Sequence, residues 1–163
     1  MPLNRSRESV LNDKDAILSL DRSGLFEEQL RFSDNLREAV ARAKSVRLPK
    51  EVKIGSRVVR YAGIRKVAVA GMGGSAIAGD ILKDWVGGEV GVSLEVCRGY
   101  HLPAYIDVDS LVFVMSYSGD TEETLSCMVD AVERGCKIVS ISSNGALRRV
   151  SEMLGLPFIQ LPK

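Results

Sequence analysis

Two short loops in the chain concentrate residues that could bind a phosphate group. One reads GMGGS (71–75) and follows the apolar run KVAVA, and the other reads SYSGDT (116–121) and follows the apolar run LVFVM. Glycines let the backbone turn tightly and approach a ligand, whereas hydroxyls and free amides at a helix start donate hydrogen bonds to phosphate oxygens. Either loop alone is more often a plain helix cap. The presence of both predicts an anion site.

The surrounding sequence predicts the elements that must position these loops. Five buried-type strands are expected at 66–70, 92–97, 111–115, 137–142 and 157–161, with helical segments at 75–85, 121–134 and 146–154. Continuous apolar runs separated by helices are typical of a parallel sheet that is covered on both faces. We therefore expect an α/β fold, a doubly wound five-stranded parallel sheet flanked by helices, with ligands at the carboxyl ends of its strands.

The N-terminal part of the chain shows a different pattern. Apolar residues at 26, 30, 36, 40 and 43 follow helical spacing after Ser23-Gly24, and an earlier, shorter helix is expected over 8–20. The segment 49–63 is compatible with a short hairpin or with an irregular connection. We expect residues 1–62 to form a helical arm that packs on the core, and residues 63–163 to form a single compact domain.

Composition excludes several classes of partner. The chain has 22 basic and 21 acidic residues, so no charge excess would attract a nucleic acid or an anionic membrane surface. It has no apolar stretch of the roughly 18 residues that would span a bilayer, and its start is polar. The three cysteines contain no CxxC pair, so they indicate neither a disulfide framework nor a metal site. We expect a cytoplasmic protein with a small-molecule or protein partner.

At the two loops, GMGGSAIAGD and SYSGDTEETL, the sequence resembles the SIS family of sugar-isomerase domains, and within it the bifunctional phosphoglucose/phosphomannose isomerases. The resemblance implies the flavodoxin-like strand order and a hexose 6-phosphate ligand without a cofactor. It also implies conversion of glucose 6-phosphate or mannose 6-phosphate to fructose 6-phosphate, and assembly as a homodimer or with a second SIS domain. The substrate-binding residues that it implies are Gly73, Gly74, Ser75, Ser116, Ser118 and Thr121.

The chain also departs from the family's pattern. Asp120 stands where these isomerases commonly have Asn, and a carboxylate beside a phosphate opposes binding unless it points away, for example to cap a helix. The Glu, His, Arg and Lys that the resemblance implies for proton transfer, ring opening and stabilisation of the enediolate match no position before Lys163. Catalytic residues are therefore unassigned, and we expect the chain alone to bind hexose 6-phosphates with little or no turnover. We interpret Glu122 and Glu123 as favourable charges at a helix start and His101 as a residue without a special role.

Two alternatives compete with the isomerase interpretation. The run GMGGSA (71–76) fits the G-x-G-x-x-A variant of a dinucleotide-binding fingerprint, with Glu95 about 20 residues later as the candidate ribose ligand. That interpretation leaves the hydroxyl-rich loop without a role. The other alternative is a regulatory domain that senses a phosphosugar without catalysis. The first 60 residues lack the basic helix-turn-helix character of a DNA-reading arm, so such a sensor would act on a protein.

Overall fold

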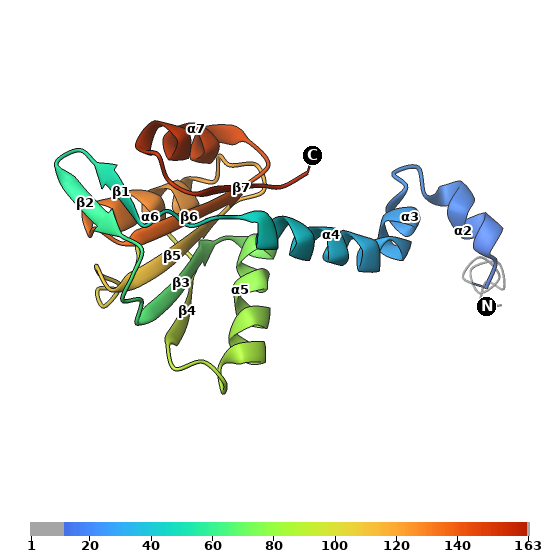
Figure 1. Ribbon diagram of the computed structural model, residues 1–163. Coiled ribbons are helices and arrows are strands. Elements are labelled where there is room, and N and C mark those ends of the chain that lie inside the picture. The colour runs from blue at the N-terminus through green and yellow to red at the C-terminus, as the bar shows by residue number, and fades with distance from the viewer. Residues whose placement is uncertain (1–11, 163) are drawn as a thin grey trace, which may run out of the picture. The chain divides into compact units, whose positions relative to one another are not determined.

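The computed structural model describes residues 12–162 and divides the chain into two compact units, with the boundary between residues 46 and 47 (Figure 1). The first unit is helical, and its helices are α2 (Lys14–Leu20), α3 (Leu25–Leu30) and α4 (Phe32–Ser45). The carboxylate of Asp13 caps α2 by accepting from two backbone amides, and Asp21 accepts from the first two amides of α3.

This helical unit differs in detail from the sequence-based expectation. The helix predicted to begin after Ser23-Gly24 is divided at Arg31, which ends α3 and precedes α4. Of the helix predicted over 8–20, the part from Lys14 onward forms α2, and residues 8–11 lie outside the described range. Packing of these helices on the core stays a prediction.

The segment that follows is a hairpin and belongs to the second unit. Strands β1 (Glu51–Ile54) and β2 (Arg57–Arg60) pair antiparallel around a Gly-Ser turn in which Gly55 has φ +60°. Just after β2, the Tyr61 hydroxyl donates to the carbonyl oxygen of Ile138 at 2.6 Å. These contacts tie the hairpin to the sheet domain, so the boundary lies at 46/47 and not at the expected 62/63.

The second unit contains the predicted doubly wound sheet. Its five parallel strands are β3 (Lys66–Gly71), β4 (Ser93–Cys97), β5 (Ser110–Met115), β6 (Lys137–Ser142) and β7 (Phe158–Gln160). Their order across the sheet is β4-β3-β5-β6-β7. The strand count, the parallel pairing and the flavodoxin-like order are all confirmed.

Three helices cover the two faces of this sheet. They are α5 (Gly73–Val86), α6 (Glu122–Glu133) and α7 (Gly145–Leu154). From β3 the chain runs through α5 to β4 on one side, and from β5 through α6 and α7 toward β7 on the other. Because such crossovers are right-handed, α5 lies on one face and α6 and α7 lie on the opposite face (Figure 1). The direction therefore reverses between β3 and β5, where a ligand crevice is expected.

The hydrophobic core lies between the sheet and the helices α6 and α7. Its fully buried side chains include Val112, Ile138, Met128 and Leu147. On the other face, Gly79 lets α5 approach the sheet closely, because a Cβ there would lie only 3.0 Å from the Val69 side chain. The carboxyl ends of β3 and β5 are thus held by packing on both faces.

Candidate functional site

The two predicted loops lie side by side at the carboxyl edge of the sheet. Strands β3 and β5 are paired in register up to Gly71 and Met115, the last residue of each strand. A Cβ at Gly71 would lie 3.0 Å from the Met115 carbonyl oxygen, so a larger residue would push the strand ends apart. We call residues 71–75 the glycine loop and residues 116–121 the hydroxyl loop. Both loops begin between β3 and β5, where the order of successive strands across the sheet changes direction.

The glycine loop leaves its backbone accessible. Gly73 has φ +50°, and apart from its chain neighbours and the backbone of α5, no atom of residues 12–162 lies within 4 Å of a Cβ built on Gly73 or Gly74. Met72 precedes α5, and among the described residues no side chain caps this helix start. The Ser75 amide donates to the Met72 carbonyl oxygen at 3.1 Å, so the exposed Gly73 and Gly74 at the start of α5 offer the amides that suit an anion.

The hydroxyl loop brings its three predicted hydroxyls together. Ser116 is buried, and its Oγ lies 2.8 Å from the Thr121 Oγ1 and 3.3 Å from the Ser118 Oγ. The amide of Gly119 donates to the same Ser116 oxygen at 3.0 Å. These contacts fold the loop around Ser116, so the three hydroxyls converge, whereas their binding of a phosphate stays a prediction.

The start of α6 is also free of a side-chain cap in the part of the chain that the structure describes. Thr121 occupies the capping position, but its hydroxyl contacts Ser116 and does not accept from its own helix. By contrast, Asp13 accepts from two amides of α2 at 3.0 and 3.1 Å. Glu122 and Glu123 lie in the first turn of α6, where their charges favour the helix dipole, as predicted.

Asp120 points to a different helix. Its Oδ1 accepts from the Ala146 amide at 2.8 Å and so caps the start of α7. The residue before α7, Asn144, makes no side-chain cap of its own within the described range. Of the three helices that begin at this edge, α7 is capped by a carboxylate, whereas α5 and α6 keep uncapped starts. The Asp120 side chain, which stands where the family commonly has Asn, thus points toward the start of α7.

A third segment supports the hydroxyl loop from behind. We call residues 141–147, from the end of β6 into α7, the bracing segment. Its Ser143 donates to the Tyr117 carbonyl oxygen twice, from the amide at 3.0 Å and from the hydroxyl at 2.7 Å. The Leu147 amide donates to the Gly119 carbonyl oxygen at 2.9 Å. Sequence reasoning missed this segment, although its Asn144-Gly145 pair is a turn signal at a helix start.

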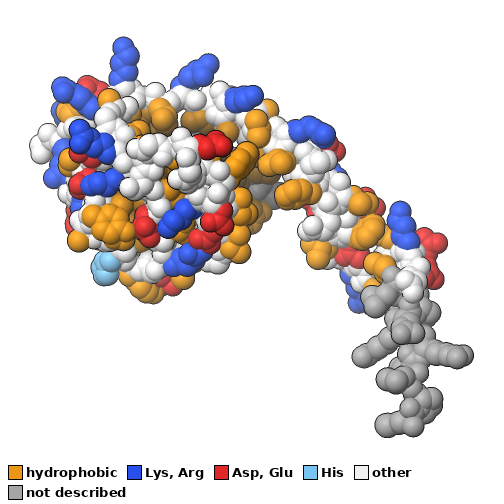
Figure 2. Space-filling model, turned by 90° about the horizontal axis from the view of Figure 1, so that it is seen from below, with side chains coloured by type: hydrophobic (Ala, Val, Ile, Leu, Met, Phe, Trp, Pro, Cys, Tyr) orange, Lys and Arg blue, Asp and Glu red, His pale blue; other side chains and the backbone are white. Residues whose placement is uncertain are grey.

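Other candidate residues lie away from the two loops or already have partners. Arg98 directly follows β4 at the same edge, and its guanidinium donates to Asp80 of α5. His101, the pale-blue side chain at the surface in Figure 2, lies in the β4–β5 connection. Its Nδ1 is 3.4 Å from an Asp130 carboxylate oxygen, and the side chain is 78% exposed. His101 thus lies at the exposed surface beside Asp130, and its lack of a special role stays a prediction.

Thiol and metal chemistry find no support in residues 12–162. Burial raises the pKa of Cys97 to about 12 and that of Cys127 to about 11, so both thiols stay protonated near neutral pH. No cluster of three metal-binding side chains occurs in this range. The same part of the chain contains no helix with the length and apolar character needed to cross a bilayer.

One apolar groove lies apart from the two loops, between α6 and α7. It has a volume of about 410 Å³, and its lining includes Leu125, Met128, Val129 and Val150. A surface of this kind offers no donors to a phosphate. The polar convergence at the carboxyl edge is therefore the better candidate site.

Known sugar-phosphate enzymes are similar in sequence to this chain. The chain is 41% identical over 118 residues to the bifunctional phosphoglucose/phosphomannose isomerase of Caldicellulosiruptor bescii, covering 71% of this chain and 35% of that protein. It is 37% identical over 99 residues to the D-glucosamine-6-phosphate 4-epimerase of Sulfolobus acidocaldarius, covering 60% of this chain and 31% of the relative. The chain thus spans about a third of the length of these relatives.

The fold agrees with a solved structure as well. A candidate phosphosugar isomerase from Clostridium difficile 630 superposes with a TM-score of 0.56 at 18% identity, covering 74% of this chain and 34% of that one. No protein-family model matches the sequence. From the sheet order, the two loops and these similarities together, the chain has the SIS fold and is related to the bifunctional phosphoglucose/phosphomannose isomerases.

Proposed function

We propose that this chain is the hexose 6-phosphate-binding SIS domain of an aldose–ketose isomerase that converts glucose 6-phosphate or mannose 6-phosphate to fructose 6-phosphate. The observation that carries the proposal is the convergence of the Ser116, Ser118 and Thr121 hydroxyls at the uncapped start of α6. The open glycine loop on the neighbouring strand supports it, because it offers space and backbone amides for the sugar. We place this reaction in the cytoplasm.

Hydroxyls and amides suit a phosphate dianion without a lysine. Each donates a hydrogen bond to a charged acceptor, and such bonds contribute about 1.5–3 kcal/mol apiece. Isomerisation additionally needs an acid, a base and a cation near the reacting carbons. His101 contacts Asp130 instead of either loop, and Glu122 and Glu123 are placed to favour the α6 dipole. Phosphate binding is therefore the part of the reaction that we assign to these loops.

We assign proton transfer to residues of a second SIS domain, because His101, Glu122 and Glu123 of this chain are not placed for it. A regulatory domain that binds the phosphosugar without catalysis would use the same two loops. The two roles differ in turnover: the isomerase role requires a glucose 6-phosphate isomerase rate in the complete assembly, whereas the sensor role does not. The geometry favours a phosphosugar ligand in both.

The dinucleotide alternative has less support. Glu95 lies two residues before the end of β4, opposite Ala68, whereas a ribose ligand is expected at the end of that strand. Desolvation raises the pKa of the Tyr105 hydroxyl, and the neighbouring Glu95 carboxylate raises it further. The hydroxyl loop also has no role in dinucleotide binding.

The test is a calorimetric titration with fructose 6-phosphate and, separately, with NAD. Wild-type protein should bind the sugar phosphate saturably, and a Ser116→Ala, Ser118→Ala double variant should bind it at least about tenfold more weakly, because two donors to a charged acceptor are lost. The matched control is Ser19→Ala, Ser45→Ala, whose hydroxyls donate only to helix carbonyls of α2 and α4. Binding of NAD without fructose 6-phosphate would overturn the proposal.

A further inference from the structure

We propose that Asp120 is a positioning residue for the phosphosugar site, where its hydrogen bond fixes the hydroxyl loop while its charge weakens phosphate binding. The inference rests on the proposed function of the two loops. It assigns Asp120 two opposed effects on one affinity, and these can be separated because Asn keeps the acceptor oxygen and removes the charge.

The positioning effect follows from how the hydroxyl loop is held. Its carbonyl groups at Tyr117 and Gly119 both accept from the bracing segment, through Ser143 and Leu147. These two carbonyl groups are therefore engaged by the bracing segment, while the amides of Gly119 and Asp120 donate to the Ser116 and Ser118 hydroxyl oxygens within the loop. Among the described residues, Asp120 is the one residue of the hydroxyl loop whose side chain forms a hydrogen bond with the bracing segment.

The junction itself tolerates little displacement. Gly119 and Gly145 have φ +81° and +84°, and a Cβ on Gly119 would lie 1.8 Å from the Asn144 carbonyl oxygen. A Cβ on Gly145 would lie 2.4 Å from the Ser118 carbonyl oxygen. Backbone contacts this close keep the two segments in fixed register. The bond from the Ala146 amide to Asp120, 2.8 Å long, secures the end of the hydroxyl loop that leads to Thr121.

The charge effect follows from sequence position. Asp120 lies between Ser118 and Thr121, two of the three residues whose hydroxyls converge. A carboxylate within the loop that receives a dianion repels it, although the start of α7 partly offsets the negative charge. This repulsion is between solvent-accessible charges, so added salt must reduce it. A purely structural cap would show no such salt dependence.

The experiment compares Asp120→Ala with Asp120→Asn by calorimetric titration of fructose 6-phosphate and of inorganic phosphate, at low and at high salt. Asp120→Ala loses the cap and the charge together, so it should bind about fivefold more weakly than Asp120→Asn at the same salt concentration, because Asn alone keeps an acceptor for the Ala146 amide. Asp120→Asn keeps an acceptor for the Ala146 amide and should bind about threefold more tightly at low salt, with the gain fading at high salt.

The matched control is Asp109→Asn, which removes the same charge from the loop before β5, at the amino-terminal edge of the sheet, and should leave affinity unchanged. If Asp120→Ala fails to fold, the sign and the salt dependence of the Asp120→Asn change still decide. Equal losses in both Asp120 variants, or a gain in Asp120→Asn that salt does not alter, would overturn the inference alone. Absence of fructose 6-phosphate binding in the wild type would instead remove the proposed function, and the inference with it.

Discussion

At the scale of single residues, the conformation of the hydroxyl loop requires a residue without a side chain at Gly119. This glycine has a positive φ, and its Cα faces the Asn144 carbonyl so closely that a Cβ would lie 1.8 Å from the oxygen. Gly55, in the β1–β2 turn, has φ +60° but nothing within 4 Å of its built Cβ among the described residues. Substitutions at the two positions therefore distinguish the cost of a left-handed backbone, which both share, from the cost of a steric clash, which only Gly119 adds.

We predict that Gly119→Ala lowers the free energy of unfolding by about 3 kcal/mol or more, because it combines a left-handed backbone with a clash against backbone atoms. Gly55→Ala should lower it by only about 1 kcal/mol, because strain alone acts there. Urea unfolding followed by circular dichroism measures both. Equal losses in the two variants would contradict the packing described for the hydroxyl loop.

The sequence predicted part of this site and missed the rest for a physical reason. The convergence of Ser116, Ser118 and Thr121 depends on local chain geometry within six residues, which the motif and the helix start already indicate. The bond from Ala146 to Asp120 joins positions 26 residues apart and exists only because β5 and β6 are neighbours. Contacts of this kind require the tertiary arrangement, so the sequence could offer a cap for Asp120 only as one possibility.

At the scale of elements, the β4–β5 connection is the one crossover between strands of the five-stranded sheet that contains no helix. Arg134, just after α6, binds this connection. Its guanidinium donates to the carbonyl oxygens of Pro103 at 2.7 Å and Leu102 at 3.0 Å, and it also contacts Asp130. One side chain thus fastens the connection to α6, the helix that begins at the hydroxyl loop.

Arg134→Ala should lower the free energy of unfolding by about 2–3 kcal/mol, because part-buried carbonyl groups lose a charged donor. Arg148→Ala is the matched control: Arg148 forms only an exposed pair with Glu152, one turn along α7, and its removal should change stability by about 0.5 kcal/mol or less. Chemical denaturation compares the two variants. A loss as small in Arg134→Ala as in the control would show that the connection is held by other contacts.

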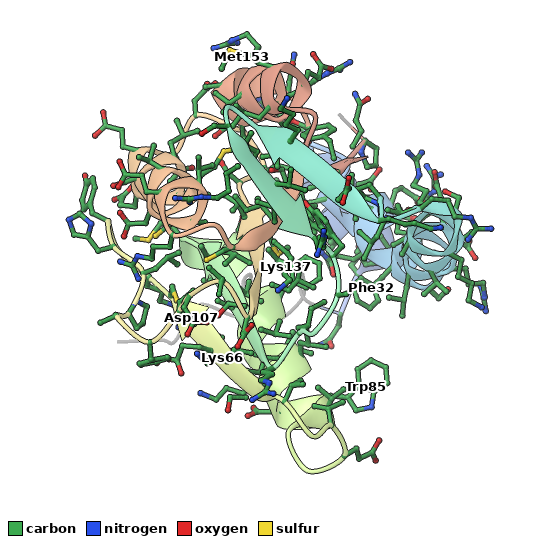
Figure 3. All side chains as sticks on the ribbon, turned by 60° about the vertical axis from the view of Figure 1, so that its left-hand side comes forward. Phe32, Lys66, Trp85, Asp107, Lys137 and Met153 are labelled. Carbon is green, nitrogen blue, oxygen red and sulfur yellow. The ribbon has the colours of Figure 1, made fainter. Side chains whose placement is uncertain are left out.

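The opposite, amino-terminal edge of the sheet is held by an ion pair between Lys66 of β3 and Asp107 of the β4–β5 connection. Figure 3 shows these side chains close together, and the Lys66 Nζ lies 2.6 Å from the Asp107 Oδ2. The hydrogen bond from Lys66, followed by that from the Asp109 amide, holds the pKa of Asp107 below its ordinary value. The pair therefore contributes stability only while Asp107 is ionised.

From this direction the pH dependence follows. The folded-state pKa is depressed, so the contribution is complete above the unfolded pKa of about 3.9 and is lost as pH falls through the lower folded value. The difference in unfolding free energy between wild type and Asp107→Asn should thus be constant above about pH 5 and shrink in stronger acid. In a Lys66→Ala background the same comparison should show a smaller change. A difference that grows on acidification would contradict the assignment.

The strands and helices of the sheet domain were predictable because each is specified by local apolar runs of the right length. The hairpin at 51–60 could not be chosen over an irregular connection, because its anchoring contacts, such as that of Tyr61 with Ile138, reach 77 residues along the chain. Because the hairpin belongs to the second unit, the boundary between the units follows residue 46 instead of residue 62. Long-range contacts, and not local propensity, decided these features.

At the scale of the whole molecule, the core of the sheet domain contains all three cysteines of the chain, and each is buried. Burial raises the pKa of Cys97 to about 12 and that of Cys127 and Cys136 to about 11. A buried, protonated thiol reacts slowly with disulfide reagents, since the thiolate is the nucleophile. Thiol reactivity therefore reports opening of the domain as a whole.

We expect native protein at pH 8 to react slowly with an aromatic disulfide reagent, and unfolded protein to release three equivalents rapidly. Across a urea series, the fraction of rapidly reacting thiol should follow the unfolding curve from circular dichroism, because all three cysteines lie in one cooperative core. Fast reaction of one equivalent in the native state would contradict the described core around that cysteine.

The central claim is that a hexose phosphate binds between the glycine loop and the hydroxyl loop, and backbone amide chemical shifts test it most directly. On addition of fructose 6-phosphate, the largest changes should fall on the amides of residues 73–75 and 117–123, with smaller changes in the bracing segment. Changes confined to the apolar groove between α6 and α7, or no changes at saturating ligand, would contradict the account.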